Sequence, residues 1–352
     1  MPSADDDAAD ADATVGAGAG DLAAVVAKPE TERAIDALRE EGVYDDSRSA
    51  GEFGPDAVAL PVTDPPTETP VREVVRSAAL ERREDTLEAR LRDRGWSDEQ
   101  VDAAPGSWAV VGDVVLVAFG DCHDREAVAE ELRDLHGADT VLARHGVSGE
   151  HREPDVEVVA GSGETETVHV EHGTKYALDL AEVLFSPGNK AERARMGEVV
   201  DPGERVLDMF AGVGYFALPM ARAGAAVTAV EKNPTAVRYL AENAVLNGVG
   251  ERVTPVRADC REVAVDPADR VVMGYYDATE REYLDAALEA LAPGGRLHVH
   301  AACPEARLWE RPVSRLEDAV AAAGREVTAL DRRRVKGHSE GVAHVVLDAT
   351  VD

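Results

Sequence analysis

The chain has 352 residues, of which 69 are Asp or Glu and 37 are Lys or Arg, so its formal net charge at pH 7 is −32. This length is typical of two or three domains. No apolar run approaches the roughly 18 residues that cross a membrane, and the N-terminus is acidic where a signal peptide is basic, so we expect a soluble, cytoplasmic protein with no membrane partner. The three cysteines are isolated from one another, which argues against a disulfide framework and against a structural metal site.

The acidic excess comes with only five lysines and 4% aromatic residues, a composition that resembles proteins of a salt-rich cytoplasm, as in a halophilic archaeon. A pI near 4.6 would normally argue against a nucleic-acid partner, because phosphate binding relies on Lys and Arg. In molar salt, however, the Debye length falls to about 3 Å. The composition therefore does not exclude RNA, and it predicts RNA binding through short-range hydrogen bonds and base stacking.

The first half of the sequence predicts several small units. Residues 1–20 form a low-complexity acidic tail that we expect to be disordered. Residues 21–63 predict a strand, a helix and a short strand, which make a small α/β module. Residues 64–105 begin with a proline-rich linker and continue as a charged helical segment over 71–95, where leucines recur at helical spacing. Residues 106–170 predict a second small α/β module.

The large C-terminal module, residues 171–352, opens with a strand–turn–helix pattern. A buried strand ends at Leu207, and a glycine-rich turn follows from Asp208. Glycine in such a turn allows positive φ and lets a ligand approach the backbone closely. The next strand ends at Glu231, 23 residues after Asp208, and the third ends at Asp259. A carboxylate at the end of the second strand can accept hydrogen bonds from both hydroxyls of a ribose.

This order of strands, turn and acids is similar to the nucleoside-binding half of S-adenosylmethionine-dependent transferases, whereas the G-x-G-x-x-G of NAD-binding folds is absent. We therefore predict an α/β fold of the Rossmann-like class I kind, with a mostly parallel seven-stranded sheet and S-adenosylmethionine (SAM) as the group donor. In such a site Asp208 would lie near the methionine amine, Glu231 on the ribose, and Asp259 with Cys260 at the adenine edge. The other predicted cofactor contacts are Phe210, Gly212 and Gly274.

Five segments resemble one transferase superfamily, which contains the tRNA guanine-37 N1-methyltransferases and the wyosine-pathway aminocarboxypropyltransferases. They are LFSPGNKAERARMGEVV, VLDMFAGVGYFALPMA, ADRVVMGYY, GGRLHVHAACPE and RRVKGHSEGVAHVVLD. The methylating branch has Asn-Leu-Pro or Asn-Pro-Pro at the end of the fourth strand, where residues 273–276 of this chain are MGYY. That difference, together with the SPGN of residues 186–189, favours the aminocarboxypropyl branch.

The resemblance implies transfer of the 3-amino-3-carboxypropyl group of SAM to C7 of 4-demethylwyosine at position 37 of tRNA-Phe, with release of methylthioadenosine. The anticodon arm of that tRNA would be the partner. Such an enzyme selects one of three electrophilic carbons by orientation, which can lower a barrier by about 7–11 kcal/mol. Two alternatives stay open: a tRNA guanine-37 N1-methyltransferase, and a non-catalytic tRNA-binding protein that retains the cofactor pocket.

The resemblance also implies roles for single side chains. Ser186 and Arg193 would hold the methionine carboxylate, a task that suits the bidentate geometry of Arg. Glu192 matches the position of a base in the methylating relatives and is the catalytic candidate, although it could equally pair with Arg193. A dense basic cluster near the C-terminus either binds tRNA phosphates or forms a solvated hairpin. Its candidate tRNA-binding residues are Arg333, Arg334, Lys336 and His338.

Aromatic and histidine pairs on the fourth and fifth strands are further candidates. Tyr275 and Tyr276 could stack on a base that is splayed out of the RNA, or one of them could belong to the core. His298 and His300 alternate along the fifth strand and therefore share a face. Because no third ligand accompanies them, we do not predict a metal site there.

Overall fold

The structure, a computed structural model, describes residues 20–77, 80–81, 85–339 and 341–352, without the side chains of Ser77 and His338. The chain divides into two compact units, Met1–Trp96 and Ser97–Asp352. The predicted disordered tail lies, except for Gly20, outside the described residues. Among the helices of the described part, none combines the length and the apolar character that crossing a membrane requires.

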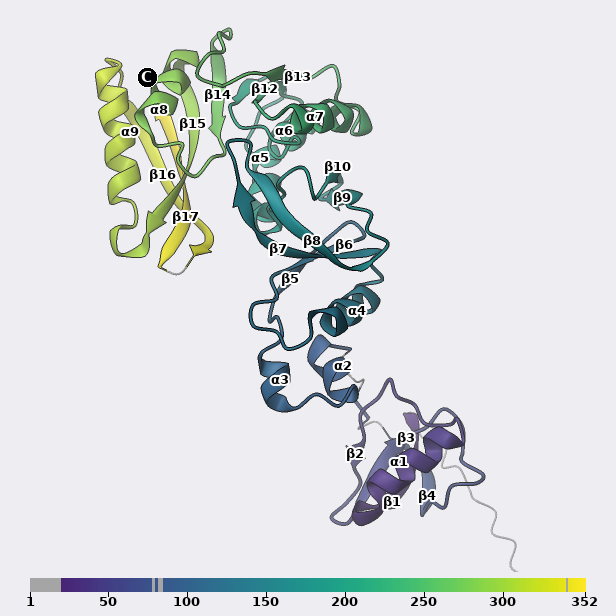
Figure 1. Cartoon of the computed structure of the whole chain (residues 1–352). Helices are drawn as coiled ribbons and strands as arrows, with labels where there is room; N and C mark the ends of the chain where they lie inside the picture. Colours follow the sequence, from purple (N-terminus) through teal and green to yellow (C-terminus); the bar gives the residue numbers. More distant parts are fainter. Residues whose placement is uncertain (1–19, 78–79, 82–84, 340) are drawn as a thin grey trace, which may run out of the picture. The chain divides into compact units, whose positions relative to one another are not determined.

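The first unit is a small antiparallel sheet with a helix against it (Figure 1). The strand order is β2-β3-β1-β4. Val26, Leu38 and Leu60 are buried together in its core. Its elements are β1 (Asp21–Ala27), η1 (Lys28–Glu30), α1 (Thr31–Glu40), β2 (Gly51–Glu52), β3 (Ala57–Pro61), β4 (Glu73–Ser77) and α2 (Leu87–Asp93).

The helical segment predicted over residues 71–95 is wrong in its first half. The chain there forms β4, which pairs with β1, and α2 begins only after Thr86, whose side chain caps it. Leu80 is buried in the small core of this unit and not on a helix face. Leucine spacing cannot reveal that β1 has an unpaired edge, and β4 forms because the backbone groups of that edge need partners.

The second unit begins with a four-stranded sheet in the order β5-β6-β7-β8, in which only β6 and β7 are parallel. Helix α4 packs on this sheet; its start is capped by Asp124 and its end by Gly137 in the left-handed conformation. A separate hairpin, β9–β10, follows. The elements are α3 (Asp98–Asp102), β5 (Trp108–Val111), β6 (Val114–Val117), α4 (Arg125–His136), β7 (Thr140–Ser148), β8 (Glu153–Gly161), β9 (Glu166–Glu171) and β10 (Thr174–Asp179).

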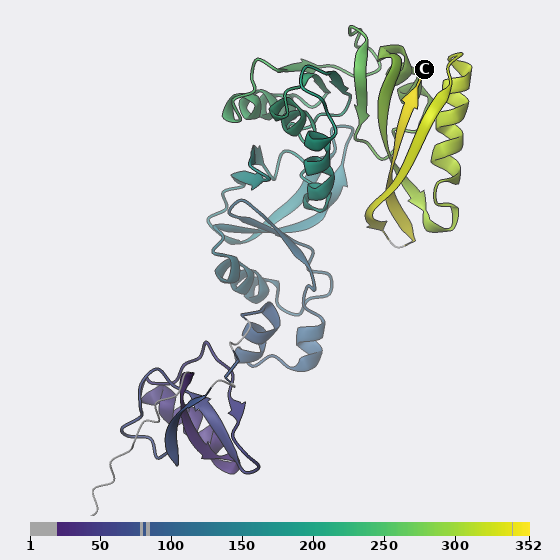
Figure 2. The ribbon, with the colours of Figure 1, turned by 180° about the vertical axis from the view of Figure 1, so that it is seen from behind.

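The main sheet has seven strands in the order β13-β12-β11-β14-β15-β17-β16, which confirms the predicted fold class. The first five strands in this order, β13, β12, β11, β14 and β15, are parallel to one another. Strand β17 pairs antiparallel with β15, and β16 pairs antiparallel with β17. Figures 1 and 2 show α9 running alongside β16 and β17. The strands are β11 (Arg205–Asp208), β12 (Ala226–Glu231), β13 (Val253–Arg257), β14 (Ala268–Met273), β15 (Leu291–Pro304), β16 (Val327–Ser339) and β17 (Val342–Val351).

The helices of this domain cover both faces of the sheet. Val206 packs in one apolar cluster and its neighbour Leu207 in another, because successive side chains of a strand point to opposite faces. The first cluster also contains Leu142 of β7, so the smaller sheet shares a core with the main domain. The helical elements are η2 (Pro187–Asn189), α5 (Lys190–Glu198), α6 (Ala217–Arg222), α7 (Pro234–Leu246), α8 (Arg281–Ala290), η3 (Glu305–Arg307) and α9 (Glu310–Ala322).

Candidate active site

A cavity of about 380 Å³ lies at the carboxyl ends of β11 to β14, the usual place for a ligand in an open α/β sheet. Its wall is built from several segments of the second unit. The residues after β11, β12 and β13 form one side, and residues 149–152, the turn between β7 and β8, add to it. Other parts of the wall come from residues 274–276 after β14, from Tyr283, from the loop before α5, and from His300 of β15 and His344 of β17.

The glycine-rich turn after β11 is fixed by the carboxylate of Glu231. The Gly212 amide donates to Glu231 Oε2 at 2.9 Å, and the Asn233 amide donates to Oε1 at 2.8 Å. Gly212 has a φ of 55°, and a Cβ on it would lie 2.3 Å from the Tyr215 ring. Only glycine fits this turn, and two backbone amides hold the Glu231 carboxylate at the cavity wall.

Asp208, predicted to contact the methionine amine, is fully buried beneath this turn and does not line the cavity. One carboxylate oxygen accepts a hydrogen bond of 3.3 Å from the Phe210 amide, and the other has no partner among the described residues. Burial raises the pKa of Asp208 to about 7, and the nearby charge of Glu231 adds to the rise. The carboxyl group is therefore close to half protonated at neutral pH.

The side of the cavity at the end of β13 combines an acid with aromatic rings. The ring centroid of Phe210 lies 5.2 Å from that of Tyr275 and 5.3 Å from that of Tyr283. The hydrogen bonds of Arg261 lower the pKa of Asp259 to about 2, so this carboxylate is ionised. Burial raises the pKa of the adjacent Cys260 thiol to about 12, so the thiol is neutral. Flat aromatic walls beside a hydrogen-bond acceptor suit a purine ring with an exocyclic amine.

Arg193, predicted to hold the methionine carboxylate, lines the cavity, and its guanidinium is held by groups of the protein. Its Nε and Nη2 atoms bond to the Glu171 carboxylate at 2.6 and 2.8 Å, and its Nη1 donates to the Ser186 carbonyl at 3.0 Å. Burial opposes ionisation, but the bonds from His169 and Arg193 lower the pKa of Glu171 to about 2. The bidentate face of Arg193 is thus occupied by Glu171, and Arg193 fixes the loop that carries Ser186 into the cavity wall.

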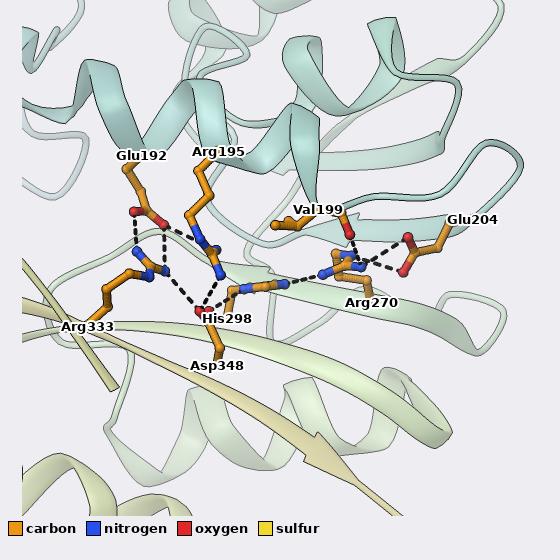
Figure 3. Close-up of polar contacts among 8 residues, drawn as sticks. All are labelled: Glu192, Arg195, Val199, Glu204, Arg270, His298, Arg333 and Asp348. Carbon is orange, nitrogen blue, oxygen red and sulfur yellow. Dashed lines mark hydrogen bonds and ion pairs between the residues drawn. The ribbon is translucent and has the colours of Figure 1, made fainter. Parts of the chain in front are cut away.

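Glu192, the catalytic candidate, does not line the cavity and belongs to a polar network beneath α5 (Figure 3). Its carboxylate accepts hydrogen bonds from both terminal nitrogens of Arg333, at 2.6 and 3.1 Å. Arg333 and Arg195 both donate to Oδ2 of Asp348, at 3.0 and 2.7 Å. The placement favours the structural role for Glu192, and its partner is Arg333 where the sequence suggested Arg193.

The same network fixes the protonation of His298. Nε2 of His298 contacts Arg270, and Nδ1 lies 2.5 Å from Oδ1 of Asp348. Because an Arg can only donate, Nε2 must accept, and Nδ1 therefore carries the proton that it donates to Asp348. Burial is the main cause that lowers the pKa of His298, with Arg270 adding to it. Arg270 continues the network to Glu204 at 3.0 Å.

Two family models together match most of the chain from residue 87 to residue 328. Residues 167–328 match the TRM5/TYW2 methyltransferase domain, and residues 87–165 match the TYW2 N-terminal domain. The tRNA(Phe) (4-demethylwyosine(37)-C(7)) aminocarboxypropyltransferase of Pyrococcus horikoshii is 38% identical over 258 residues, 72% of this chain and 92% of the relative. The enzyme of the same name from Methanocaldococcus jannaschii is 39% identical, over 68% of this chain and 95% of the relative. The chain belongs to the TYW2 family.

Solved structures agree with this assignment. Pyrococcus horikoshii TYW2 in complex with MeSAdo has a TM-score of 0.65 and 36% identity, and it covers 75% of this chain and 98% of its own. Trm5b from Pyrococcus abyssi has a TM-score of 0.68 at 27% identity and covers 94% of this chain and 99% of its own. The match to the methylating branch thus extends further along the chain, whereas identity is higher to TYW2.

The basic cluster on β16 is only partly available to RNA. Arg333 is committed to Glu192 and Asp348, and Arg334 is exposed and bonded to Glu305. Lys336 is half-buried; burial, Arg193 and Arg144 lower its pKa. The side chain of His338 lies outside the described residues.

Sequence reasoning missed several residues of the cavity wall. Arg152 comes from the turn between β7 and β8, and its guanidinium carbon lies 5.6 Å from the Tyr275 ring centroid. Asn189, Tyr283 and His344 also line the cavity. Asn189 and His344 lie in segments that carry the family resemblance, but the sequence does not show that they line the cavity, because each of these residues enters the site through tertiary packing. In the described part of the chain, no cluster of three or more His, Cys, Asp or Glu side chains is arranged to hold a metal ion.

Proposed function

We infer that this chain transfers the 3-amino-3-carboxypropyl group of SAM to C7 of 4-demethylwyosine at position 37 of tRNA-Phe. Two relatives at 38% and 39% identity carry that name. The single structural observation that supports it best is Gly274 at the end of β14. A Cβ there would lie 2.7 Å from the Phe216 ring, so the strand end has no room for the Asn or Pro of the methylating branch without displacing Phe216.

The residues of the cavity fit SAM as the donor. Glu231 is held by two backbone amides and would accept hydrogen bonds from the ribose. Phe210 and Tyr283 would contact the adenine, with Asp259 accepting from its amine and Cys260 adding a neutral contact. Gly212 lets the Tyr215 ring pack against the turn, because a Cβ on Gly212 would lie 2.3 Å from that ring. Ser186 would lie beside the methionine arm, in the loop that Arg193 fixes.

The chemistry requires the donor's Cγ to face the base. A bond forms between C7 and Cγ while the Cγ–S bond breaks, and the sulfur keeps the electron pair as methylthioadenosine leaves. The hydrogen of C7 leaves as a proton, which restores the aromatic ring. The protein's task is to orient Cγ and keep the methyl away from any acceptor, because orientation decides which of the three carbons reacts.

The substrate is a tRNA, and we place its anticodon arm, which carries position 37, at the mouth of the cavity. Lys336 supports this placement, because its Nζ lies 2.9 Å from where a Cβ of Gly188 would be, in the loop that helps to form the cavity. Arg334 is exposed on the same strand. In molar salt such cations act on phosphates only at short range.

The test uses SAM labelled separately in the methyl group and in the carboxyl group. With tRNA-Phe that contains 4-demethylwyosine, in molar KCl, we expect only the carboxyl label to reach the tRNA. A transcript with unmodified guanine-37 is the matched control substrate and should receive neither label. Methyl label on that transcript would contradict the proposal and assign the chain to the methylating branch.

A further inference from the structure

Nε2 of His300 and Oδ1 of Asn189, both in the cavity wall, have no hydrogen-bond partner among the described residues. Nδ1 of His151, in the turn between β7 and β8, is a further such atom. His300 is 1% exposed, so its free nitrogen is shielded from bulk water. Buried polar atoms are nearly always hydrogen-bonded, and each exception needs an explanation. A bound molecule that supplies the missing partners is such an explanation.

The His300 and Asn189 atoms lie in a part of the cavity that differs from the cofactor side. Glu231 and Asp259 follow β12 and β13, whereas His300 belongs to β15, on the other side of β11 and β14 in the sheet. Nδ1 of His300 lies 3.0 Å from Nε2 of His344 on β17. The wall here contains no carboxylate: it is made of His300, His344, Asn189, Tyr276, Phe216 and Gly274.

Aromatic rings enclose the histidine pair. The Phe216 ring centroid lies 5.2 Å from that of His300, and the Tyr276 ring meets His344 edge-on at 4.8 Å. Burial raises the pKa of Tyr276, and the nearby Asn189 side chain acts against this rise, so Asn189 lies beside this ring while its Oδ1 atom has no partner among the described residues. Flat apolar surfaces with a few neutral donors and acceptors suit an uncharged aromatic heterocycle.

We propose that this part of the cavity, formed by β14, β15, β17 and the loop before α5, receives the base to be modified, with Nε2 of His300 and Oδ1 of Asn189 hydrogen-bonding to its edge. The inference rests on the proposed function, which supplies the substrate. That base is a fused tricycle derived from guanine, so it offers donor and acceptor atoms along its edge and two flat faces. The side of the cavity with Glu231 and Asp259, the cofactor wall, and the side with His300 and His344, the histidine wall, would then hold the two reactants on opposite sides of β11 and β14.

His300 acts in this arrangement as a positioning residue and not as a base. Burial lowers its pKa to about 3, so the ring is neutral at physiological pH and is a weak proton acceptor. The bond to His344 leaves Nε2 as an acceptor when Nδ1 donates, and as a donor when Nδ1 accepts. The pair can therefore match either kind of atom on the base without a change in net charge.

The test compares His300→Phe with His300→Gln. Phe keeps a flat ring and removes both nitrogens, whereas the Gln amide can place a polar atom near the position of Nε2. We expect His300→Phe to lower the single-turnover rate of carboxyl-label transfer at least tenfold, with less than a twofold change in the Kd for SAM. His300→Gln should recover a third or more of the lost rate. The exposed His145, changed to Phe and to Gln, is the matched control, and neither change should alter the rate.

Asn189→Leu provides a second, independent variant, because Asn189 is only half-buried and Leu has a similar size. We expect it to lower the transfer rate at least fivefold while SAM still binds. The inference would be overturned if the His300→Phe and Asn189→Leu variants transferred the carboxyl label at the wild-type rate. A parallel loss of SAM binding would also overturn it, as would a His300→Gln variant as slow as His300→Phe, since both would indicate a packing role. Failure of the wild type to transfer carboxyl label would instead contradict the proposed function.

Discussion

Glu231 and Glu192 are both glutamates of the second unit whose carboxylates accept two hydrogen bonds, yet their partners differ. Glu231 is bonded by two backbone amides at the cavity wall. Glu192 is bonded by the guanidinium of Arg333, 141 residues away, in the network beneath α5. Neutral amides leave the charge of Glu231 available to a ligand, whereas Arg333 neutralises that of Glu192. The same side chain is thus a binding group in one region and a structural group in the other.

Substitutions in the network should therefore lower the stability of the fold, whereas substitutions in the cofactor wall should weaken the binding of SAM. Three carboxylates of the network, those of Glu192, Glu204 and Asp348, face three guanidiniums, so its formal charge is balanced when His298 is neutral. The guanidiniums belong to Arg195, Arg270 and Arg333. Removing one member leaves buried charge without a partner. Removing Glu231 leaves two backbone amides at the cavity wall, and removing Asp259 leaves the exposed Arg261, which keeps its hydrogen bond to Glu282.

The largest effect is expected for Asp348→Ala. Asp348 accepts hydrogen bonds from Arg195, Arg333 and His298, so its loss strands three donors at once. We expect the free energy of unfolding to fall by about 3–5 kcal/mol, as for a broken buried ion pair. Denaturant unfolding in molar KCl measures it.

The matched control for this change is Asp269→Ala. Asp269 pairs with Arg205 at 3.1 Å in an exposed position, where ion pairs add little. We expect this variant to unfold at nearly the wild-type denaturant concentration. Equal losses of unfolding free energy in Asp348→Ala and Asp269→Ala would contradict a special role for the network. They would not affect the assignment of the cofactor wall to the nucleoside.

A smaller effect, on binding and not on folding, is expected for Glu231→Ala and Asp259→Ala. Each change removes charge-assisted hydrogen bonds to the nucleoside, worth about 1.5–3 kcal/mol. We expect the Kd for SAM to rise at least tenfold in calorimetric titration, with the unfolding midpoint changed little. Unchanged affinity in two folded variants would remove the assignment of this wall to the nucleoside.

The two regions also differ in how far the sequence reveals them. Asp208 and Glu231 end β11 and β12, and Asp259 follows the end of β13 by two residues. Because these strands belong to one stretch of parallel βα units, local pattern and topology together predict that the three acids gather at one edge of the sheet. The partners of Glu192 and Arg193 could not be predicted in this way. Arg333 and Glu171 reach them from distant strands, and ion pairing has no sequence period.

Asp208 shows the limit within the predictable region. Its position at the end of β11 follows from the sequence, but its depth does not, because burial depends on how the turn above it closes. The same applies to β4, whose strand depends on the free edge of β1. Arg152 lines the cavity only because a hairpin of the smaller sheet extends to it.

The smallest expected effect, on pH dependence, separates Asp208 from the ionised acids Asp259 and Asp348. Folding raises the pKa of Asp208 from 3.8 to about 7, mainly through burial, so the folded state holds this proton more tightly than the unfolded state. The contribution of the group to stability is therefore greatest at low pH and is lost as the pH rises above 3.8.

Between pH 6 and pH 8 this loss of unfolding free energy is about 1.4 kcal/mol. Ionisation of Asp208 stabilises the unfolded state by about 1.4 kcal/mol per pH unit in this range, and ionisation of the same group in the folded state offsets half of that effect. Asp208→Asn removes the ionisation, and the difference in unfolding free energy between the variant and the wild type should change by that amount across this range. Paired denaturant titrations of the SAM-free proteins at pH 6 and pH 8 in molar KCl measure it, and the surface acids cancel because both proteins share them. A difference that stays constant with pH would mean that Asp208 is already ionised at pH 6, as the acids with Arg partners are.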